Sequence, residues 1–573
     1  MVALFGSRPL RAPVGPDAHR WNTFHGERTL IVAARTVTST VRVLETLPAL
    51  LRGDSRVSVV FAHDPTSAFN SGVLELLHHA GCQVMPWEQL GSVAPDLVLT
   101  ASENIDVPEG DCPVLVLPHG VGFQKLVPDS RSPRERLSGV VPESLLESGR
   151  AWLAVSHPDQ EEQLLVSHPK AAGRTLLVGD PCFDELLAGR DHRRQYREAL
   201  GVAGGQRLVV ISSTWGPTSL LGSQPDLFAR ILGELPCDEY RVAAIVHPNV
   251  WAAHGAWQLR VLQAAALDAG LLLMPPVHAW RAALVAADVV VGDHGSVTLY
   301  GASLGTPVLL AAFGADAVPG TAIHALGAVA PRLDPRGDIL GQIADTVREH
   351  RPQRYAALTR QAFAEPGQAL ARLRTDLYQL LKLPEPSSPP PSAAALPSPE
   401  PPAAPVTSWQ VTTEVVTDDG QPAVVVRRFP ASVRSPGGED GPQSFAHLAC
   451  TDAERDPRLA ESASVVLHHR PAPTTISALH WIRDTLARLP GCLLAASAVR
   501  GGGCLVGLGD GRVVEVAVTG PVTDPGLPAA VVYACLRAGL PLHDAFVTVR
   551  TGDLRAEDAV LRLRPSLRPG SPW

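Results

Sequence analysis

Two histidines follow short apolar runs of the sequence, at places where a general base or a phosphate contact could lie. His119 and Gly120 come after the apolar stretch Val114–Leu117, and His247 comes after Val242–Val246. An imidazole in such a position can take a proton from a substrate or donate a hydrogen bond to a phosphate oxygen. A neighbouring glycine lets a ligand approach the backbone closely. Each histidine alone could equally be a loop or capping residue, so both are candidate catalytic residues.

A third segment places glycine and hydroxyl groups between an apolar run and a helical pattern. Val289–Gly292 is followed by Asp293, Gly295, Ser296 and Thr298. The free backbone N–H groups and the dipole at the start of a helix favour a bound phosphate. This turn is therefore a candidate phosphate site, with a conventional capped turn as the alternative interpretation.

The elements that must position these segments are short buried strands with helices between them. The apolar runs are four or five residues long, rich in leucine and β-branched residues, and without polar alternation, as expected of parallel strands covered on both faces. Helical spacing of apolar residues from Val73 to Ala80 ends at Gly81. The expected strands are 30–34, 57–61, 82–85, 97–100 and 114–117 in a first series, and 208–212, 242–246, 271–274, 289–292 and 308–311 in a second.

Two such series in succession predict an α/β protein with a pair of Rossmann-like domains. Ligands of open α/β sheets bind at the carboxyl ends of the strands, so the candidate residues would face a cleft between two lobes. The stretch Pro384–Pro405 holds ten prolines in 22 residues, which predicts an extended spacer without a core of its own. The expected division is 1–27 as an N-terminal extension, 28–178 as the first lobe, 179–383 as the second lobe with a closing helix, 384–405 as a Pro-rich linker, and 406–573 as a small α+β domain.

The C-terminal part predicts strands joined by tight turns. The segment 418–421, Asp-Asp-Gly-Gln, is typical of a hairpin turn between 410–416 and 423–428. The glycines at 501–503 and 507–509 connect strands to strands and lack a following lysine, so they indicate turns and not phosphate loops. His468 and His469 have no partner at metal-ligand spacing and are expected in an exposed loop. Further strands are expected at 492–499, 503–507, 512–518 and 546–550, with a helix at 529–539. Regulation or partner binding is the role suggested by the tethered position.

Composition excludes several classes of function. A net charge of −8, with no run of lysines or arginines, disfavours nucleic acid as a partner. The eight cysteines include no Cys-x-x-Cys pair, which fits thiols in a reducing cytoplasm. No signal peptide or membrane span is expected, so the protein is predicted to be cytoplasmic. Peripheral contact with the inner face of the membrane is left open. No Asp-x-Asp motif follows a strand, so neither a metal nor another cofactor is expected.

Taken together, these segments resemble the CDP-glycerol glycerophosphotransferases of teichoic-acid synthesis, and more distantly the UDP-N-acetylglucosamine 2-epimerases. Residues 119–126 are similar to the family's segment Trp-His-Gly-Thr-Pro-Leu-Lys-Lys-Leu, and 179–184 to Gly-Tyr-Pro-Arg-Asn-Asp between the lobes. Ser213-Thr214-Trp215 is similar to Pro-Thr-Trp, His247-Pro248 matches a His-Pro pair, and 293–307 corresponds to the Asp-Tyr-Ser-Ser segment with its downstream proline.

The resemblance implies a GT-B architecture and transfer of a glycerophosphate or glycosyl group from a nucleotide-activated donor to an acceptor that the sequence does not identify. It implies that His119 is the general base and that His247 helps to bind or activate the donor. The nucleotide- or phosphate-binding residues would be Gly120, Ser213, Thr214, Asp293, Gly295, Ser296 and Thr298.

The sequence departs from the family where an acidic residue is expected to contact the ribose, because Tyr300 stands there. The same position in related folds carries a carboxylate that accepts from two hydroxyl groups. Two alternatives to a transferase therefore stay open: a catalytically silent nucleotide-binding or regulatory protein, and an epimerase or hydrolase of sugar nucleotides. Tyr300 favours the silent protein, whereas the presence of both histidines favours catalysis.

Overall fold

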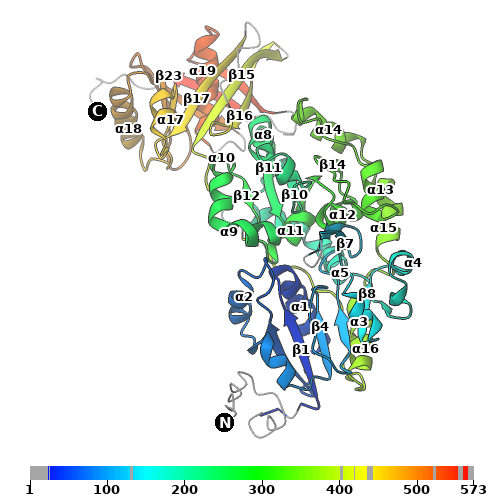
Figure 1. The fold of residues 1–573 in the computed structure, drawn as a ribbon. Coiled ribbons are helices and arrows are strands. Elements are labelled where there is room, and N and C mark those ends of the chain that lie inside the picture. Colours follow the sequence, from blue (N-terminus) through cyan, green and yellow to red (C-terminus); the bar gives the residue numbers. More distant parts are fainter. Residues whose placement is uncertain are drawn as a thin grey trace.

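The computed structural model describes residues 23–24, 26–129, 133–400, 404–418, 420–434, 443–519, 524–552 and 559–565. Most of the expected extension 1–27 and residues 401–403 of the expected linker lie outside these ranges, as does residue 419 of the predicted turn. Two α/β lobes and a β-barrel follow one another along the molecule, from the blue lobe through the green lobe to the yellow and red barrel (Figure 1).

The first lobe is built on a parallel sheet of order β3-β2-β1-β4-β5-β8-β9. Strand β1 pairs in parallel with β2 on one side and β4 on the other, and five of its seven residues are fully buried, which explains the unbroken apolar run. The lobe contains β1 (Arg28–Ala34), α1 (Val37–Leu50), β2 (Val57–His63), α2 (Val73–His79), β3 (Val84–Pro86), η2 (Trp87–Ser92), β4 (Leu97–Thr100), β5 (Val114–Val116), β6 (Leu126–Pro128), β7 (Glu135–Leu137), α3 (Glu143–Glu147), β8 (Ala151–Val155), α4 (Pro158–Ser167), η3 (Pro169–Ala171) and β9 (Thr175–Leu177).

The second lobe repeats the plan with five parallel strands in the order β12-β11-β10-β13-β14. Both lobes thus have the strand order of a doubly wound sheet, and the predicted pair of Rossmann-like domains is confirmed. The lobe contains α5 (Pro181–Ala188), η4 (Arg190–His192), α6 (Arg193–Ala199), β10 (Arg207–Ser213), α7 (Leu220–Ser223), α8 (Leu227–Glu234), β11 (Tyr240–Val246), α9 (Pro248–Leu262), α10 (Ala264–Asp268), β12 (Leu272–Leu273), α11 (Ala279–Ala286), β13 (Val289–Gly292), α12 (Ser296–Ser303), β14 (Val308–Leu310), α13 (Ala322–Val329), α14 (Ile339–Glu349), η5 (Pro352–Tyr355) and α15 (Ala356–Ala362).

The closing helix α16 (Ala369–Leu380) returns to the first lobe. Its residues Leu373, Leu377 and Tyr378 belong to the same apolar cluster as β1 and α1. The Pro-rich segment that follows lies against the second lobe: Leu396 is buried in the core of that lobe, and its carbonyl accepts a hydrogen bond of 2.9 Å from the hydroxyl of Tyr196. This part of the predicted spacer therefore contacts the second lobe along its path.

The C-terminal domain closes into a barrel of order β15-β16-β22-β23-β21-β20-β19-β18-β17. The apolar helix α19 is buried over 526–535 and packs against six of these strands. The predicted hairpin is present, with Asp418 paired to Gln421. The barrel contains β15 (Ser408–Asp418), β16 (Gln421–Pro430), β17 (Ser444–Thr451), α17 (Pro457–Ser462), β18 (Val465–Leu467), α18 (Thr475–Arg488), β19 (Leu494–Ala498), β20 (Cys504–Leu508), β21 (Val513–Thr519), α19 (Gly526–Arg537), β22 (Ala545–Thr551) and β23 (Ala559–Pro565).

Two sets of contacts made by this domain had no signal in the sequence. In the loop after β18, Nδ1 of His469 lies 2.7 Å from Oδ1 of Asp452, and His468 stacks on Trp481. The domain also contacts the second lobe directly. Arg428 of β16 donates to both carboxylate oxygens of Asp238 in the second lobe, at 2.9 and 2.7 Å.

Candidate functional site

A cavity of about 450 Å³ lies between the two lobes, where the carboxyl ends of their strands meet. His119 and His247 both line it, as do Gly120, Ser213, Thr214, Gly295 and Ser296. The fold therefore brings together most of the residues that the sequence singled out. The wall carries four Lys or Arg residues and two glutamates, a formal charge of +2, whereas the whole chain carries −8. The cavity is thus the place where an anion would be favoured.

The hydrogen bonding of His119 gives its imidazole the form of a base. The residue follows β5, and its Nδ1 lies 3.3 Å from the backbone oxygen of Ala101. A carbonyl oxygen only accepts hydrogen bonds, so Nδ1 carries the proton and Nε2 of the neutral ring keeps its lone pair. An imidazole in this tautomer can accept a proton from a substrate hydroxyl.

Glu103 lies behind His119 and was not found from the sequence. Its Oε2 is 3.9 Å from Nδ1 of His119, and its Oε1 accepts a hydrogen bond of 3.0 Å from Arg136. Burial by itself would raise the pKa of Glu103, but the adjacent His119 and Arg136 outweigh it and hold that pKa below its usual value. The carboxylate therefore stays charged and would stabilise the imidazolium that forms when His119 takes a proton.

His247 has the opposite tautomer. It follows β11, and its Nδ1 accepts a hydrogen bond of 3.1 Å from the backbone N–H of Asn249. The proton of the neutral ring is then on Nε2, which makes His247 a hydrogen-bond donor. Burial, followed by the nearby His119 and Lys125, lowers the pKa of His247 to about 3, so the ring stays neutral at ordinary pH.

The amino end of α12 supplies a second set of donors. Gly295 caps this eight-residue helix without a side-chain hydrogen bond, and no described residue accepts from the N–H groups of Ser296 and Val297. Both residues line the cavity. Two free N–H groups at the positive end of a helix dipole form a ready site for a phosphate.

Asp293 and Thr298 do not line the cavity but lie behind this turn. The carboxylate of Asp293 is fully buried and accepts hydrogen bonds from the backbone N–H groups of Thr214 (2.9 Å), Leu220 (2.8 Å) and Gly295 (3.0 Å). Thr298 is also fully buried, and its hydroxyl has no partner among the described residues. The geometry gives Asp293 the role of holding the turn in place, and it places neither side chain where a ligand in the cavity could touch it.

The two lobes touch at the edge of the cavity. The backbone N–H of Val121 donates to Oγ of Ser296 at 3.2 Å, and a Cβ on Gly120 would come within 2.7 Å of that oxygen. A larger residue at position 120 would therefore have to displace the Ser296 side chain. At the end of β10, Ser213 donates to the carbonyl of Thr214 at 3.0 Å and accepts from the N–H of Leu221 at 3.1 Å, which occupies its hydroxyl within the loop.

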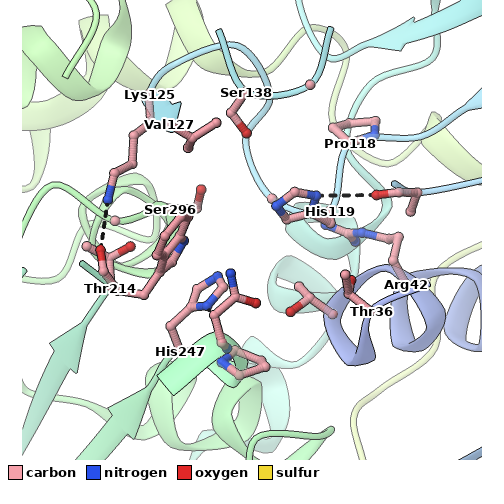
Figure 2. Close-up of a pocket in the computed structure, with 18 of the residues that line it drawn as sticks. Thr36, Arg42, Pro118, His119, Lys125, Val127, Ser138, Thr214, His247 and Ser296 are labelled. Carbon is pink, nitrogen blue, oxygen red and sulfur yellow. Dashed lines mark hydrogen bonds between the residues drawn. The ribbon is translucent and has the colours of Figure 1, made fainter. Parts of the chain in front are cut away.

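A chain of half-buried charged groups that sequence reasoning missed fixes Lys125 against the second lobe. Its Nζ lies 3.2 Å from Asp316 and donates to the carbonyl of Trp215 at 3.1 Å. Asp316 in turn lies 3.0 Å from Nε2 of the buried His294. Figure 2 shows Lys125 on the same side of the cavity as Thr214 and Ser296. Lys125 thus adds a positive charge to the wall that carries the free N–H groups.

Tyr300 occupies the position where the resemblance led us to expect a carboxylate. Its hydroxyl donates to Oδ2 of Asp180 at 2.6 Å, and its ring stacks on Phe363 with 5.7 Å between centroids. Burial, followed by the neighbouring Asp180, raises the pKa of Tyr300 well above its usual value. The hydroxyl is already engaged, so this side chain offers no free acceptor pair for a ribose.

The comparisons with known proteins give solved structures of similar fold. No model of a protein family matches the sequence, and no curated protein is detectably similar to it. A UDP-GlcNAc 2-epimerase from Neisseria meningitidis, solved with UDP-GlcNAc bound, is similar over 62% of this chain and 99% of its own, with 12% identity and a TM-score of 0.38. The wall teichoic acid polymerase TagF is similar over 62% of this chain and 90% of its own, with 11% identity and a TM-score of 0.39. A glycosyltransferase from Rickettsia africae gives 11% identity, 62% and 99% coverage, and a TM-score of 0.35. Both kinds of protein that the sequence motifs resemble are among these structures.

Proposed function

We propose that the two lobes transfer a group from a nucleotide-activated donor to a hydroxyl group of an acceptor. The observation that carries this proposal is the pairing of opposite tautomers in one cavity. His119 presents a lone pair, whereas His247 presents an N–H beside a positively charged wall. A base on one side and neutral or positive donors on the other are what such a transfer requires.

The division of labour follows from these positions. Nε2 of His119 takes the proton of the acceptor hydroxyl while the acceptor oxygen forms its bond to the transferred group. The bond between that group and the nucleotide phosphate breaks, and the nucleotide leaves with the electron pair. Hydrogen bonds from Nε2–H of His247 and from the N–H groups of Ser296 and Val297 stabilise the negative charge on its phosphate. Glu103 then stabilises the protonated His119.

The test begins with binding and ends with turnover. We would measure thermal stabilisation of the protein by CDP, UDP and GDP derivatives, and then incubate the best binder with alcohol and sugar acceptors. We expect at least one nucleoside diphosphate derivative to stabilise the protein, and its nucleotide to be released when an acceptor is present. No stabilisation by any nucleotide would contradict the proposal.

A pair of substitutions at Ser296 isolates the backbone donors. Proline is tolerated at the first position of a helix after an extended residue, and Gly295 has φ −83° and ψ 157°. Ser296→Pro removes the N–H and the hydroxyl, whereas Ser296→Ala removes the hydroxyl alone. We expect Ser296→Pro to weaken nucleotide binding by about tenfold or more relative to Ser296→Ala, as for the loss of one hydrogen bond to a charged group. Equal affinities would exclude the amino end of α12 as the phosphate site.

A silent nucleotide-binding protein is the second candidate function. The observation in its favour is that the hydroxyl of Tyr300 is engaged by Asp180 and leaves no carboxylate for the ribose. Stabilisation by a nucleotide with neither release of nucleotide nor conversion of the donor would support this candidate. An epimerase would convert the donor without an acceptor and without release, and a hydrolase would release nucleotide in water alone, so chromatography of both the donor and the released nucleotide separates all four.

Contact with a membrane surface remains a prediction. Among the described residues, no helix combines the length and the apolar character that crossing a membrane requires. Flotation of the protein with anionic vesicles would test peripheral contact.

A further inference from the structure

Arg42 is a buried cation of the cavity wall. It lies on α1 in the first lobe, its side chain is 7% exposed, and it lines the cavity. The nearest carboxylate oxygen belongs to Asp180, at 4.0 Å from its Nη2, and no described residue accepts a hydrogen bond from the guanidinium. A buried guanidinium with five unused N–H groups is costly unless something binds it.

The amino end of α1 faces the same part of the cavity. Thr36 caps this 14-residue helix and accepts from the N–H of Ser39, but no described residue accepts from the N–H groups of Val37 and Thr38. The hydroxyl of Thr38, a residue of the cavity wall, is buried and likewise has no partner among the described residues. Figure 2 shows Thr36, Arg42 and His119 on one side of the cavity, and Lys125, Thr214 and Ser296 on the other.

The carboxylates near Arg42 are already engaged by other groups. Glu45 pairs with Arg281. Asp180 accepts from the hydroxyl of Tyr300 and from the backbone N–H groups of Cys182 and Phe183. Neither of these two carboxylates is thus free to satisfy Arg42.

We propose that Arg42, the hydroxyl of Thr38 and the free N–H groups of α1 form a second anion site, separate from the site at α12. Its ligand is a phosphate monoester or a carboxylate carried by the acceptor; that the ligand is the acceptor rests on the function proposed above. Bound there, the anion would hold the acceptor on the side of the cavity that carries His119 and bring its hydroxyl to the base.

The experiment measures anion binding by calorimetry with the α12 site already filled. The protein is saturated with the nucleoside diphosphate that stabilises it best, and glycerol 1-phosphate, glycolate and glycerol are titrated in separate runs. We expect the phosphate or the carboxylate probe to bind and neutral glycerol not to bind. Binding by only one of the two anions identifies the acceptor's group. No binding of either anion, or displacement of the nucleotide by it, would overturn the proposal.

Two variants decide whether Arg42 itself holds the anion. Arg42→Gln should weaken binding of the anionic probe by about tenfold or more and leave nucleotide affinity within about twofold, and Arg42→Lys should retain most of the binding. Ser296→Pro should show the reverse pattern. If Arg42 only neutralises Asp180, Arg42→Gln will lower thermal stability and leave probe affinity unchanged, which would defeat the proposal.

Thr38→Val supplies a second test should Arg42→Gln fail to fold, because it removes an unpartnered hydroxyl with little change of shape. It should weaken binding of the anionic probe and leave nucleotide affinity unchanged; unchanged probe affinity would count against the site.

Failure of the proposed function can be distinguished from failure of the anion site. If no nucleotide binds but glycerol 1-phosphate still binds in an Arg42-dependent way, the anion site stands and the donor assignment falls.

Discussion

The two walls of the cavity differ in how firmly their donors are held. In the second lobe, the turn before α12 rests on the buried carboxylate of Asp293, which accepts three backbone hydrogen bonds. In the first lobe, His119 is held by one hydrogen bond of 3.3 Å, and the guanidinium of Arg42 makes none with the residues that the structure describes. Both walls offer the free N–H groups of a helix terminus.

This difference indicates which hydrogen-bond donors are held in position before a ligand binds. Donors that are fixed in advance cost no reorganisation when charge develops on a phosphate. An unsatisfied guanidinium instead gains its partner from the ligand, so its contribution is realised only on binding. We therefore expect changes in the second lobe to affect both folding and nucleotide binding, and changes in the first lobe to affect chemistry and acceptor binding.

The largest expected effect comes from removing His119, the proposed base of the first lobe. His119→Ala should lower the rate of nucleotide release with acceptor by about 10²–10⁴-fold, the range for general-base catalysis. Nucleotide affinity should stay within about twofold. His79→Ala, at an exposed position of α2, is the control and should change neither quantity. Full turnover by His119→Ala would show that the first lobe does not supply the general base through His119.

The next effect comes from removing the support of the second wall. Asp293→Ala leaves three buried N–H groups without an acceptor, so the free energy of unfolding should fall by about 3 kcal/mol or more. Urea denaturation measures this, and nucleotide stabilisation should be lost as well. Asp268→Ala, at an exposed site of α10, should change stability by less than about 0.5 kcal/mol. A stable Asp293→Ala protein with unchanged nucleotide binding would show that this carboxylate is not needed to hold the turn before α12 in place.

The pH dependence of stability sharpens the comparison with a third region, the barrel. Burial lowers the pKa of both His247 and His447 to about 3, and neither nitrogen of His447 has a hydrogen-bond partner among the described residues. Between about pH 6.5 and 3 the unfolded chain binds more protons at these sites than the folded protein does. Each histidine therefore makes the folded protein less stable as the pH falls, by at most about 1.4 kcal/mol per pH unit.

Replacing either histidine by a group that does not titrate should reduce this loss. His247→Gln and His447→Leu should both lose less stability than the wild type between pH 7 and pH 5, measured by urea denaturation. Only His247→Gln should alter nucleotide affinity, because His447 lies in the barrel. Equal effects of the two substitutions on nucleotide affinity would show that His247 contributes no more to nucleotide binding than a buried histidine of the barrel does.

The smallest effect is expected at Tyr300. Tyr300→Phe leaves one oxygen of Asp180 without a donor, and the free energy of unfolding should fall by about 1 kcal/mol. Nucleotide affinity should stay within about twofold, because the hydroxyl already has a partner. Tyr300→Leu, which also removes the stacking on Phe363, should cost more stability and serves as the comparison. A tenfold loss of affinity in Tyr300→Phe would show that the hydroxyl binds the ligand.

The sequence by itself determined the two doubly wound sheets and the three segments that end at the cavity. Strands buried on both faces need uninterrupted apolar runs, and β4 and β13 lie where those runs are. It did not identify β8 and β9, since short apolar runs can also belong to helices. Closure of the barrel was likewise missed, because it depends on pairs far apart in the chain, such as the parallel pair of β16 and β22.

Only the tertiary structure decided what each candidate residue does. His119 and His247 look alike in sequence, and their tautomers are set by Ala101 and Asn249, whose hydrogen bonds have no sequence signature. Asp293 was expected to contact a phosphate but supports the loop instead. The roles proposed for Glu103 and Arg42 follow from their places beside His119 and in the cavity wall. Local spacing determines strands and turns, whereas charge partners come from packing between segments that the sequence keeps apart.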